Sequence, residues 1–435
     1  MGGTIPTSPL PVASRIIRAD GAFPLTPPPT EFIIGFLYFL KPTAREERAR
    51  MLNYDLTEEQ QILRDSVREF AEKEIKPVAE ELDEKEEFSL DLVKKMAELG
   101  LFGMFVSEEY GGSDVGYVAY VIAVEEIARI DGSAAATVAA ANSLGIGPIY
   151  YFGNDEQRRE WLPRLCRGEI LSSFGLTEPN AGSDAGGSQT TAELANGEWT
   201  INGSKIFITN SSSPISEIII VQAKTGDRGN GKSELSCILV PNNTPGVTAK
   251  TMHKKMMWRS SNTGELYFEN VKVPEKNLMG KRGEGFKQML STLDRGRLAI
   301  AAMGLGGAQG ALELALAYAK ERRQFGQPLA NFQAIAFKLA DMAMEIEAAR
   351  SLLYKASWLC EQERAFSMEA AMAKLYCSEV MSRAVNHAVQ IHGGYGLMRE
   401  YQIERFYRDQ KLLEIGEGTS EIQRIVIARN LGCFE

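Results

Sequence analysis

The sequence predicts an α+β fold with an N-terminal α-helical domain, a middle β-domain and a C-terminal α-helical bundle. Apolar residues recur at helical spacing up to about residue 168, and this spacing returns after residue 284. Between these regions lie short β-type runs that are separated by prolines and glycines. The chain has 435 residues, enough for two or three packed units. The expected boundaries are 1–52 (a disordered or spurious N-terminal extension), 53–170, 171–283 and 284–435.

The N-terminal extension differs in composition from the rest of the chain. It is rich in proline, and its longest apolar run, Phe32 to Leu40, is too short to cross a bilayer. Arg15 and Arg18 with few acidic neighbours are a faint sign of a transit peptide. We interpret the segment as a disordered tail or the result of a misplaced start codon, because organised sequence begins just after Met51.

Composition argues against several classes of function. The net charge of −9 disfavours a general nucleic-acid binder, and no membrane span is expected. The five cysteines are scattered without a CxxC pair, which favours a reducing compartment. We therefore expect a cytoplasmic protein, with the mitochondrial matrix as the alternative. Three histidines make a histidine-rich metal site improbable, and no metal is expected.

Helix signals open the first domain and organise the bundle. Thr57 and Gln60 have the spacing of a capping box, which predicts that a helix begins there. In the bundle, apolar residues alternate steps of four and three, which predicts a tightly packed helical seam. Its members are Ile335, Leu339, Met342, Ile346, Ala349 and Leu353.

The middle domain carries strand signals. Two short strands, Glu198–Ile201 and Lys205–Thr209, are expected around a turn at Asn202-Gly203. Further strands are expected at Glu217–Lys224, Leu235–Val240 and Glu265–Phe268.

Two nucleotide-binding patterns are rejected on context. Residues 226–233 match GxxxxGK[ST], but another strand follows them, whereas a P-loop needs a helix at that point. We interpret them as a polar hairpin loop and keep a P-loop NTPase only as a distant alternative. Residues 304–310 resemble a dinucleotide fingerprint, but they lie inside an expected helix without a preceding strand. Their small residues are expected to let helices approach closely, which disfavours a nicotinamide dehydrogenase.

Other blocks of the sequence combine turn residues, hydroxyl groups and charged groups in a specific order. One ends a helix with two guanidinium groups, which suit a diphosphate. The blocks are 174–184, 205–210, 321–328, 390–396, 407–409 and 415–423. In this order and spacing they resemble the acyl-CoA dehydrogenase family over nearly all of residues 53–432, and its short-chain, butyryl-CoA-like members in particular.

The resemblance implies a fold and an activity. The fold would have an N-terminal α-helical domain, a middle β-domain and a C-terminal four-helix-bundle domain, in a homotetramer with one FAD per subunit. The activity would be FAD-dependent α,β-dehydrogenation of a short-chain acyl-CoA to the trans-2-enoyl-CoA. Family members pass their electrons to electron-transferring flavoprotein, and the pathway implied is fatty acid β-oxidation.

The resemblance also assigns site residues. Many members carry tryptophan where Phe207 stands, which leaves the redox tuning of a flavin open. The implied FAD-binding residues are Phe174, Leu176, Thr177, Ser183, Phe207, Ile208, Thr209, Arg322, Phe325, Gln333, Gln390, Gly393, Gly394, Thr419 and Glu421. Those implied for the substrate are Ser183, Asp294, Arg297 and Gly418.

Glu417 is the candidate catalytic base. The reaction needs a carboxylate that removes the α-proton, and burial against flavin and thioester raises a carboxyl pKa toward the working pH. Gly416 and Gly418 flank Glu417 and allow a close backbone approach. Ser420 and Gln423 resemble a capping box that would begin the last helix and fix this loop.

Absent groups decide between some alternatives within the family. Isovaleryl-type members place their base at the position of Gly296, so the base here would be Glu417. Glutaryl-type members carry an arginine at the position aligned with Ala135, which favours an uncharged acyl chain here. An acyl-CoA oxidase, a dehydrogenase of branched or cyclic acyl-CoA, and a catalytically inactive scaffold of the same fold stay open.

Overall fold

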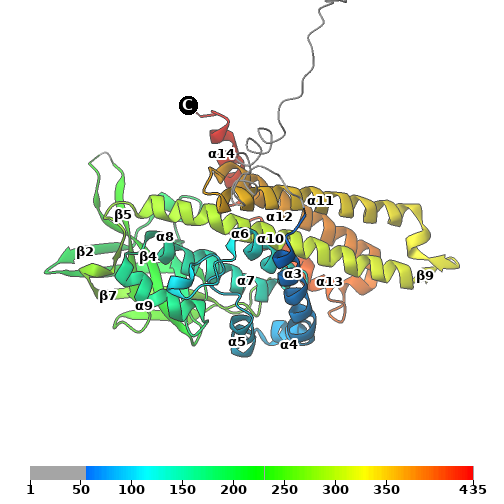
Figure 1. Cartoon of the computed structure of the whole chain (residues 1–435), viewed down its shortest axis with the longest axis horizontal. Helices are drawn as coiled ribbons and strands as arrows, with labels where there is room; N and C mark the ends of the chain where they lie inside the picture. The colour runs from blue at the N-terminus through cyan, green and yellow to red at the C-terminus, as the bar shows by residue number, and fades with distance from the viewer. Residues whose placement is uncertain (1–54, 230, 435) are drawn as a thin grey trace, which may run out of the picture. The chain divides into compact units, whose positions relative to one another are not determined.

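The computed structural model describes residues 55–229 and 231–434. The expected N-terminal extension therefore lies outside the described residues. Helices come first, a β-sheet follows, and long helices complete the chain, which confirms the predicted fold class (Figure 1). The described residues pack as one unit, so the boundaries between domains stay predictions.

The N-terminal helices begin where the sequence predicts. In α3 (Glu58–Phe70), the Thr57 hydroxyl accepts from the Gln60 N–H at 3.2 Å, and the Gln60 side chain accepts from the Thr57 N–H at 3.0 Å. The capping box is therefore confirmed. The elements that follow are η1 (Ala71–Ile75), α4 (Lys76–Lys85), α5 (Leu90–Glu98), η2 (Glu108–Tyr110), α6 (Gly116–Ala128), α7 (Gly132–Ala140), η3 (Ala141–Ile146), α8 (Gly147–Phe152) and α9 (Asp155–Cys166).

An eight-stranded sheet forms the middle of the described chain. Its order is β6-β7-β3-β2-β4-β5-β8, and β1 pairs with β4 in parallel. The strands are β1 (Leu171–Gly175), β2 (Thr191–Ala195), β3 (Glu198–Thr209), β4 (Ser216–Asp227), β5 (Ser233–Pro241), β6 (Val247–Thr251), β7 (Thr263–Pro274) and β8 (Leu278–Met279). The strands predicted at 217–224, 235–240 and 265–268 are confirmed inside longer ones.

The turn predicted at Asn202-Gly203 is wrong. Residues 198–209 form one strand, β3, and both of its halves pair with β7. An Asn-Gly pair forms a hairpin turn only when its two flanks pair with each other, so here it makes a bulge between Ile201 and Gly203 instead. Glycine is needed there, because its φ is +148° and a β-carbon would lie 2.7 Å from the Thr190 Cα.

The segment that matches a P-loop joins β4 to β5. These strands pair antiparallel down to Asp227 and Ser233, so the segment connects two strands of a hairpin. Strand β5, not a helix, begins at Ser233, and the rejection of a P-loop is confirmed.

Five helices complete the chain, and the first four, which pack on one another, confirm the predicted bundle. They are α10 (Gly285–Glu321), α11 (Gln333–Glu361), α12 (Ser367–His392), α13 (Ile403–Leu413) and α14 (Ser420–Asn430). The shorter elements are η4 (Ala185–Gly187), η5 (Glu275–Asn277), β9 (Arg323–Gln324), β10 (Gln327–Pro328), η6 (Leu329–Asn331) and η7 (Gly393–Leu397). The predicted seam on α11 is buried apart from the partly buried Ile335.

Small residues let α10 pack against several helices at once. A β-carbon on Gly304 would lie 2.9 Å from the carbonyl oxygen of Cys377 on α12. On Gly306 or Gly310 it would collide with a carbonyl oxygen at the end of α6. Residues 304–310 are therefore a helix-packing motif, as the sequence predicts. Among the described helices only α10 is long and apolar enough to cross a bilayer, and 78% of that stretch is buried in this packing.

Candidate functional site

Glu417 lies in the loop between α13 and α14. Its backbone has a φ of +52°, which is uncommon for a residue other than glycine. The residue is half-buried, but its Oε2 atom is buried and has no hydrogen-bond partner among residues 55–229 and 231–434. A strained backbone that holds an unpartnered carboxylate oxygen is characteristic of a reactive group.

Three helices contribute groups near this carboxylate. On α10, a β-carbon built at Gly296 would overlap Oε2 of Glu417 and lie 2.8 Å from its Cδ, so this glycine leaves the space that the carboxylate fills. Arg297 follows on the same helix, and Lys374 lies on α12. On α6, the burial of the Tyr120 hydroxyl and the negative charge of Glu417 both raise the tyrosine pKa.

The environment of Glu417 tunes its acidity. Burial is the largest effect and raises the pKa of its carboxyl to about 7, although the positive charges of Arg297 and Lys374 act to lower it. A carboxyl group with this pKa is partly ionised at neutral pH, which suits a general base.

The predicted capping box at Ser420 is wrong. The N-cap of α14 is Thr419, whose hydroxyl accepts from the Ile422 N–H at 3.3 Å. Ser420 is the first helical residue, and its hydroxyl is buried without a partner in the described chain. Gln423 instead donates to the carbonyl oxygens of Glu417 at 3.3 Å and Gly418 at 2.8 Å. The loop is therefore fixed as predicted, but by different contacts.

Two of the predicted FAD-binding blocks lie side by side. The Ile206 N–H donates to the Thr177 carbonyl at 2.9 Å, which ties the segment after β1 to β3. Phe207 has a φ of +61° and a side chain that is 62% exposed. The hydroxyl groups of Thr177 and Thr209 make no hydrogen bond within the described residues, and Ser183 is exposed. The other predicted members, Phe174, Leu176 and Ile208, are buried.

A buried ion pair under these blocks was not predicted. Lys205 donates to Glu178 at 2.7 Å and to the Leu176 carbonyl at 3.2 Å. Burial alone would raise the pKa of Glu178, but Lys205 and the donors of Ser188 and Gln189 hold it at about 2. The alternation of Trp199 and Ile201 toward the core would have placed Lys205 on the buried face, so the strand pattern did contain a signal.

The other predicted FAD-binding residues lie far from this surface. Arg322 and Phe325 follow the end of α10, and the Arg322 guanidinium stacks 5.6 Å from the Tyr395 ring of η7. Phe325 is 93% exposed, and Gln333 and Gln390 are exposed as well. A β-carbon on Gly393 or Gly394 would meet nothing within 4 Å. The sheet lies at one end of α10 and β9 at the other, and this helix of 37 residues is roughly 55 Å long (Figure 1). One chain therefore does not bring the two sets together.

The four residues predicted near the substrate are divided as well. Arg297 is buried and donates to Asp294 at 2.5 Å, and Asp294 also accepts from Ser367 at 3.0 Å. Arg297 and Gly418 lie near the Glu417 carboxylate, whereas Ser183 lies on the surface of the sheet domain. The exposed Glu421 stands in the first turn of α14, beside its cap.

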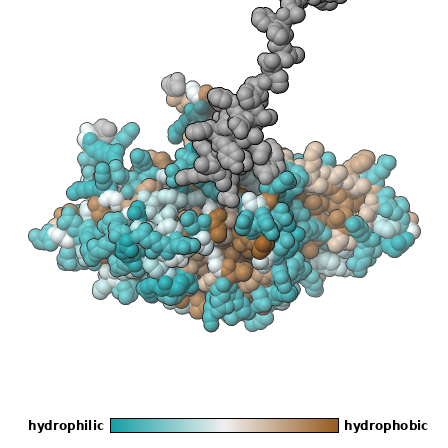
Figure 2. Space-filling view, in the orientation of Figure 1, coloured by the Kyte–Doolittle hydropathy of each residue, from teal (hydrophilic) through white to brown (hydrophobic). Residues whose placement is uncertain are grey.

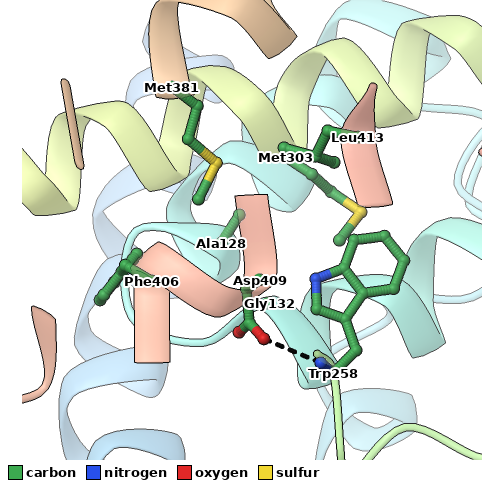
Figure 3. Close-up of a pocket in the computed structure, with 8 residues that line it drawn as sticks. All are labelled: Ala128, Gly132, Trp258, Met303, Met381, Phe406, Asp409 and Leu413. Carbon is green, nitrogen blue, oxygen red and sulfur yellow. Dashed lines mark hydrogen bonds between the residues drawn. The ribbon is translucent and has the colours of Figure 1, made fainter. Parts of the chain in front are cut away.

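The cavity in Figure 3 is not this site. It has a volume of about 10 Å³, room for no more than about one water molecule. None of the predicted site residues lines it, and one lining residue, Asp409, accepts from the Trp258 N–H at 2.8 Å. No group of three or more potential metal ligands occurs within the described residues.

The fold has a helical, a β and a second helical part in chain order, and the last part places the Glu417 carboxylate beside α10 and α12. Three family models match the chain in order: the acyl-CoA dehydrogenase N-terminal domain at 57–169, the middle domain at 173–271 and the C-terminal domain at 283–432. The chain therefore belongs to the acyl-CoA dehydrogenase family, and it is an oxidoreductase.

Named relatives agree with this membership. A probable acyl-CoA dehydrogenase of Bacillus subtilis (strain 168) is 54% identical, with 87% of this chain and 100% of that protein covered. The structure of butyryl-CoA dehydrogenase from Megasphaera elsdenii has a TM-score of 0.85 and is 43% identical, over 87% of this chain and 100% of that one. An acyl-CoA dehydrogenase complexed with FAD from Bacillus anthracis has a TM-score of 0.82 at 35% identity, over 88% and 68% of the two chains.

A further structure is described as electron transferring flavoprotein of Acidaminococcus fermentans. A chain in it matches with a TM-score of 0.85 and 43% identity, over 87% of this chain and 99% of that one.

Proposed function

We propose that this protein catalyses FAD-dependent α,β-dehydrogenation of a short-chain acyl-CoA, with Glu417 as the base that removes the α-proton. The observation that carries this proposal is the Glu417 carboxylate, which is held against Gly296 with a pKa of about 7 and an unpartnered oxygen. A general base has to be ionised near the working pH, and a pKa of about 7 supports this role for Glu417.

The chain offers a surface that fits FAD. The exposed Phe207 ring provides a face for an aromatic ring system, and the neighbouring hydroxyl groups of Thr177 and Thr209 have no partner among the described residues. Arg322 and the open backbone at Gly393 and Gly394 suit a diphosphate. The FAD complex of the relative from Bacillus anthracis supports the same cofactor.

Residues of this chain would divide the reaction between them. Glu417 would take the α-proton and become a neutral acid between Arg297 and Lys374. The backbone N–H groups of Glu417 and Gly418 donate to nothing in the described chain, so they are free to polarise the thioester carbonyl. Bound FAD supplies an acceptor for the β-hydride. Loss of the proton and the hydride leaves the trans-2-enoyl-CoA.

The substrate and the electron acceptor are part of the proposal. The 43% identity to butyryl-CoA dehydrogenase supports a short acyl chain. The position aligned with the arginine of glutaryl-type members is occupied by the buried, uncharged Ala135, which favours an uncharged acyl chain. The match in the structure of electron transferring flavoprotein supports that protein as the acceptor.

We also propose a homotetramer in the cytoplasm. Apolar colour covers the long helices toward β9 in Figure 2, and Phe325, Phe337 and Met344 are exposed along this part of the chain. An exposed apolar surface of this kind is typical of an interface between subunits.

Glu417→Gln tests the central role. Glutamine keeps the shape but cannot accept a proton, so the variant should retain FAD and bind butyryl-CoA. Anaerobic stopped-flow should show flavin reduction slowed by more than the roughly 10²–10⁴-fold that is typical for loss of a general base. Reduction within tenfold of wild type would mean that another residue is the base. Rapid reoxidation of the reduced flavin by oxygen would instead support an acyl-CoA oxidase.

A further inference from the structure

Lys374 is a fully buried cation without an ion-pair partner. Its side chain comes from the middle of α12 and is 0% exposed. No carboxylate within the described residues lies close enough to it for a salt bridge. Its ammonium group donates one hydrogen bond, to the carbonyl oxygen of Gly418 at 2.8 Å. An ammonium group has three donors, and burying it is costly unless something compensates its charge.

The other fully buried lysine shows what ordinary compensation looks like. Lys205 donates to the carboxylate of Glu178 at 2.7 Å and to the Ser188 hydroxyl at 3.2 Å. Lys374 has no such partner, and the negative charge that favours its protonated form most strongly is that of Glu417. The structure thus buries an unpaired positive charge next to the candidate base. A purely structural role for Lys374 does not explain this placement.

We propose that Lys374 is a positioning residue of the active site, which fixes the Glu417 loop through the Gly418 carbonyl and supplies the positive charge that faces the Glu417 carboxylate. This inference rests on the proposed role of Glu417 as the base.

The loop needs such support because its backbone is strained. Glu417 has a φ of +52° and Gly418 a φ of +94°. The Gly418 carbonyl receives two donors, Lys374 and Gln423, and Gln423 also donates to the Glu417 carbonyl. Both side chains hold the Gly418 carbonyl, but only Lys374 brings a charge. Gln423 therefore provides the matched control.

Charges on other elements also face this pair. Arg297 on α10 acts on Glu417 more strongly than Lys374 does, but it is itself paired with Asp294. Burial lowers the pKa of Lys374 to about 8, while Glu417, Glu414 at the end of α13 and Glu421 on α14 act to raise it. Tyr120 on α6 is buried with its pKa raised, so it is neutral over the working range. Of these groups, Lys374 is the unpaired cation that also binds the loop.

The experiment compares charge with hydrogen bonding. Lys374→Met removes both, Lys374→Gln removes the charge but keeps a donor, and Gln423→Met removes a donor without changing charge. For each FAD-loaded variant, kcat/KM for butyryl-CoA with a dye acceptor is measured from pH 5.5 to 9. Because a positive neighbour favours the ionised carboxylate, both Lys374 variants should shift the acid limb upward by about one pH unit. At pH 6 this shift lowers kcat/KM about tenfold below wild type, in addition to any decrease that is the same at every pH. Gln423→Met should lower the whole profile without moving its pKa.

The outcomes separate this inference from the proposed function. An acid limb that stays within 0.2 pH units of wild type in Lys374→Gln, or an equal shift in Gln423→Met, overturns the proposal. If Lys374→Met does not fold, Lys374→Gln alone still gives the answer, because it retains a polar partner for the carbonyl. Failure of the proposed function would look different, since wild type itself would then lack acyl-CoA turnover or Glu417→Gln would remain active.

Discussion

Gly296→Ala should separate the stability of this protein from its activity. Gly296 lies inside α10 without a positive φ, so alanine fits the backbone there. A helix-interior glycine costs about 1 kcal/mol relative to alanine, and the substitution should recover part of this. The new β-carbon, however, would occupy the space of the Glu417 carboxylate.

The size of the effect follows from the contact. The distance from the β-carbon to Cδ of Glu417 would have to grow from 2.8 Å to at least 3.4 Å, and Oε2, which is nearer, would have to move further. The carboxylate ends a flexible side chain, so this movement costs little folding energy. The same movement should slow catalysis strongly, because a misplacement of about 1 Å lowers the rate roughly 10²-fold.

Two measurements decide the matter. Chemical denaturation should give a free energy of unfolding equal to or above that of wild type, and anaerobic flavin reduction by butyryl-CoA should fall about a hundredfold. Gly307→Ala is the matched control on the same helix. The nearest atoms to its β-carbon would belong to the flexible side chain of Met381, and none of them belongs to Glu417. If Gly296→Ala reduces flavin within twofold of wild type, the carboxylate does not act from the place where it lies.

Two other substitutions test the cofactor surface and the buried ion pair beneath it. Arg322→Ala should weaken FAD retention more than it slows the fully loaded enzyme, because its guanidinium is suited to a diphosphate; an unchanged FAD dissociation constant would contradict the assignment. Lys205→Met should lower the free energy of unfolding by about 3–5 kcal/mol, since it leaves Glu178 buried without its counter-charge. Because the folded pKa of Glu178 is depressed to about 2, its stabilising effect in wild type is present above about pH 4.3 and is lost as the pH falls toward 2. A denaturation midpoint in Lys205→Met equal to that of wild type would exclude this role.

Local sequence rules succeeded where the partner of a segment was its neighbour in the chain. The Thr57 capping box needs only Gln60, three residues away, and it formed as predicted. The segment before Ser233 could be recognised as a hairpin because both flanking strands were visible. The seam on α11 follows from the spacing of its own apolar residues.

The predictions that failed depended on contacts that the local sequence pattern did not show. Asn202-Gly203 forms a bulge because both flanks pair with β7, a strand that begins sixty residues after Gly203. Gln423 is spaced to cap a helix, but the nearby carbonyls of Glu417 and Gly418 take its amide donors. Lys374 had no visible role in the sequence, because its importance depends on which loop α12 packs against. The bulge and the contact of Lys374 depend on long-range contacts that a local pattern does not encode, whereas Gln423 has local partners, which compete with the cap for its amide.

The separation of the predicted FAD-binding residues bears on the assembly. Thr177 and Phe207 lie by the sheet, at one end of α10, whereas Arg322 and Phe325 follow the other end of this helix, which is roughly 55 Å long. A single dinucleotide bound to one chain does not reach both. If both sets bind FAD, each cofactor is therefore shared between two chains, and the exposed apolar residues near β9 are part of the contact that brings them together. FAD affinity should then depend on protein concentration in wild type, because dilution into separate chains removes one of the two sets of contacts from every cofactor.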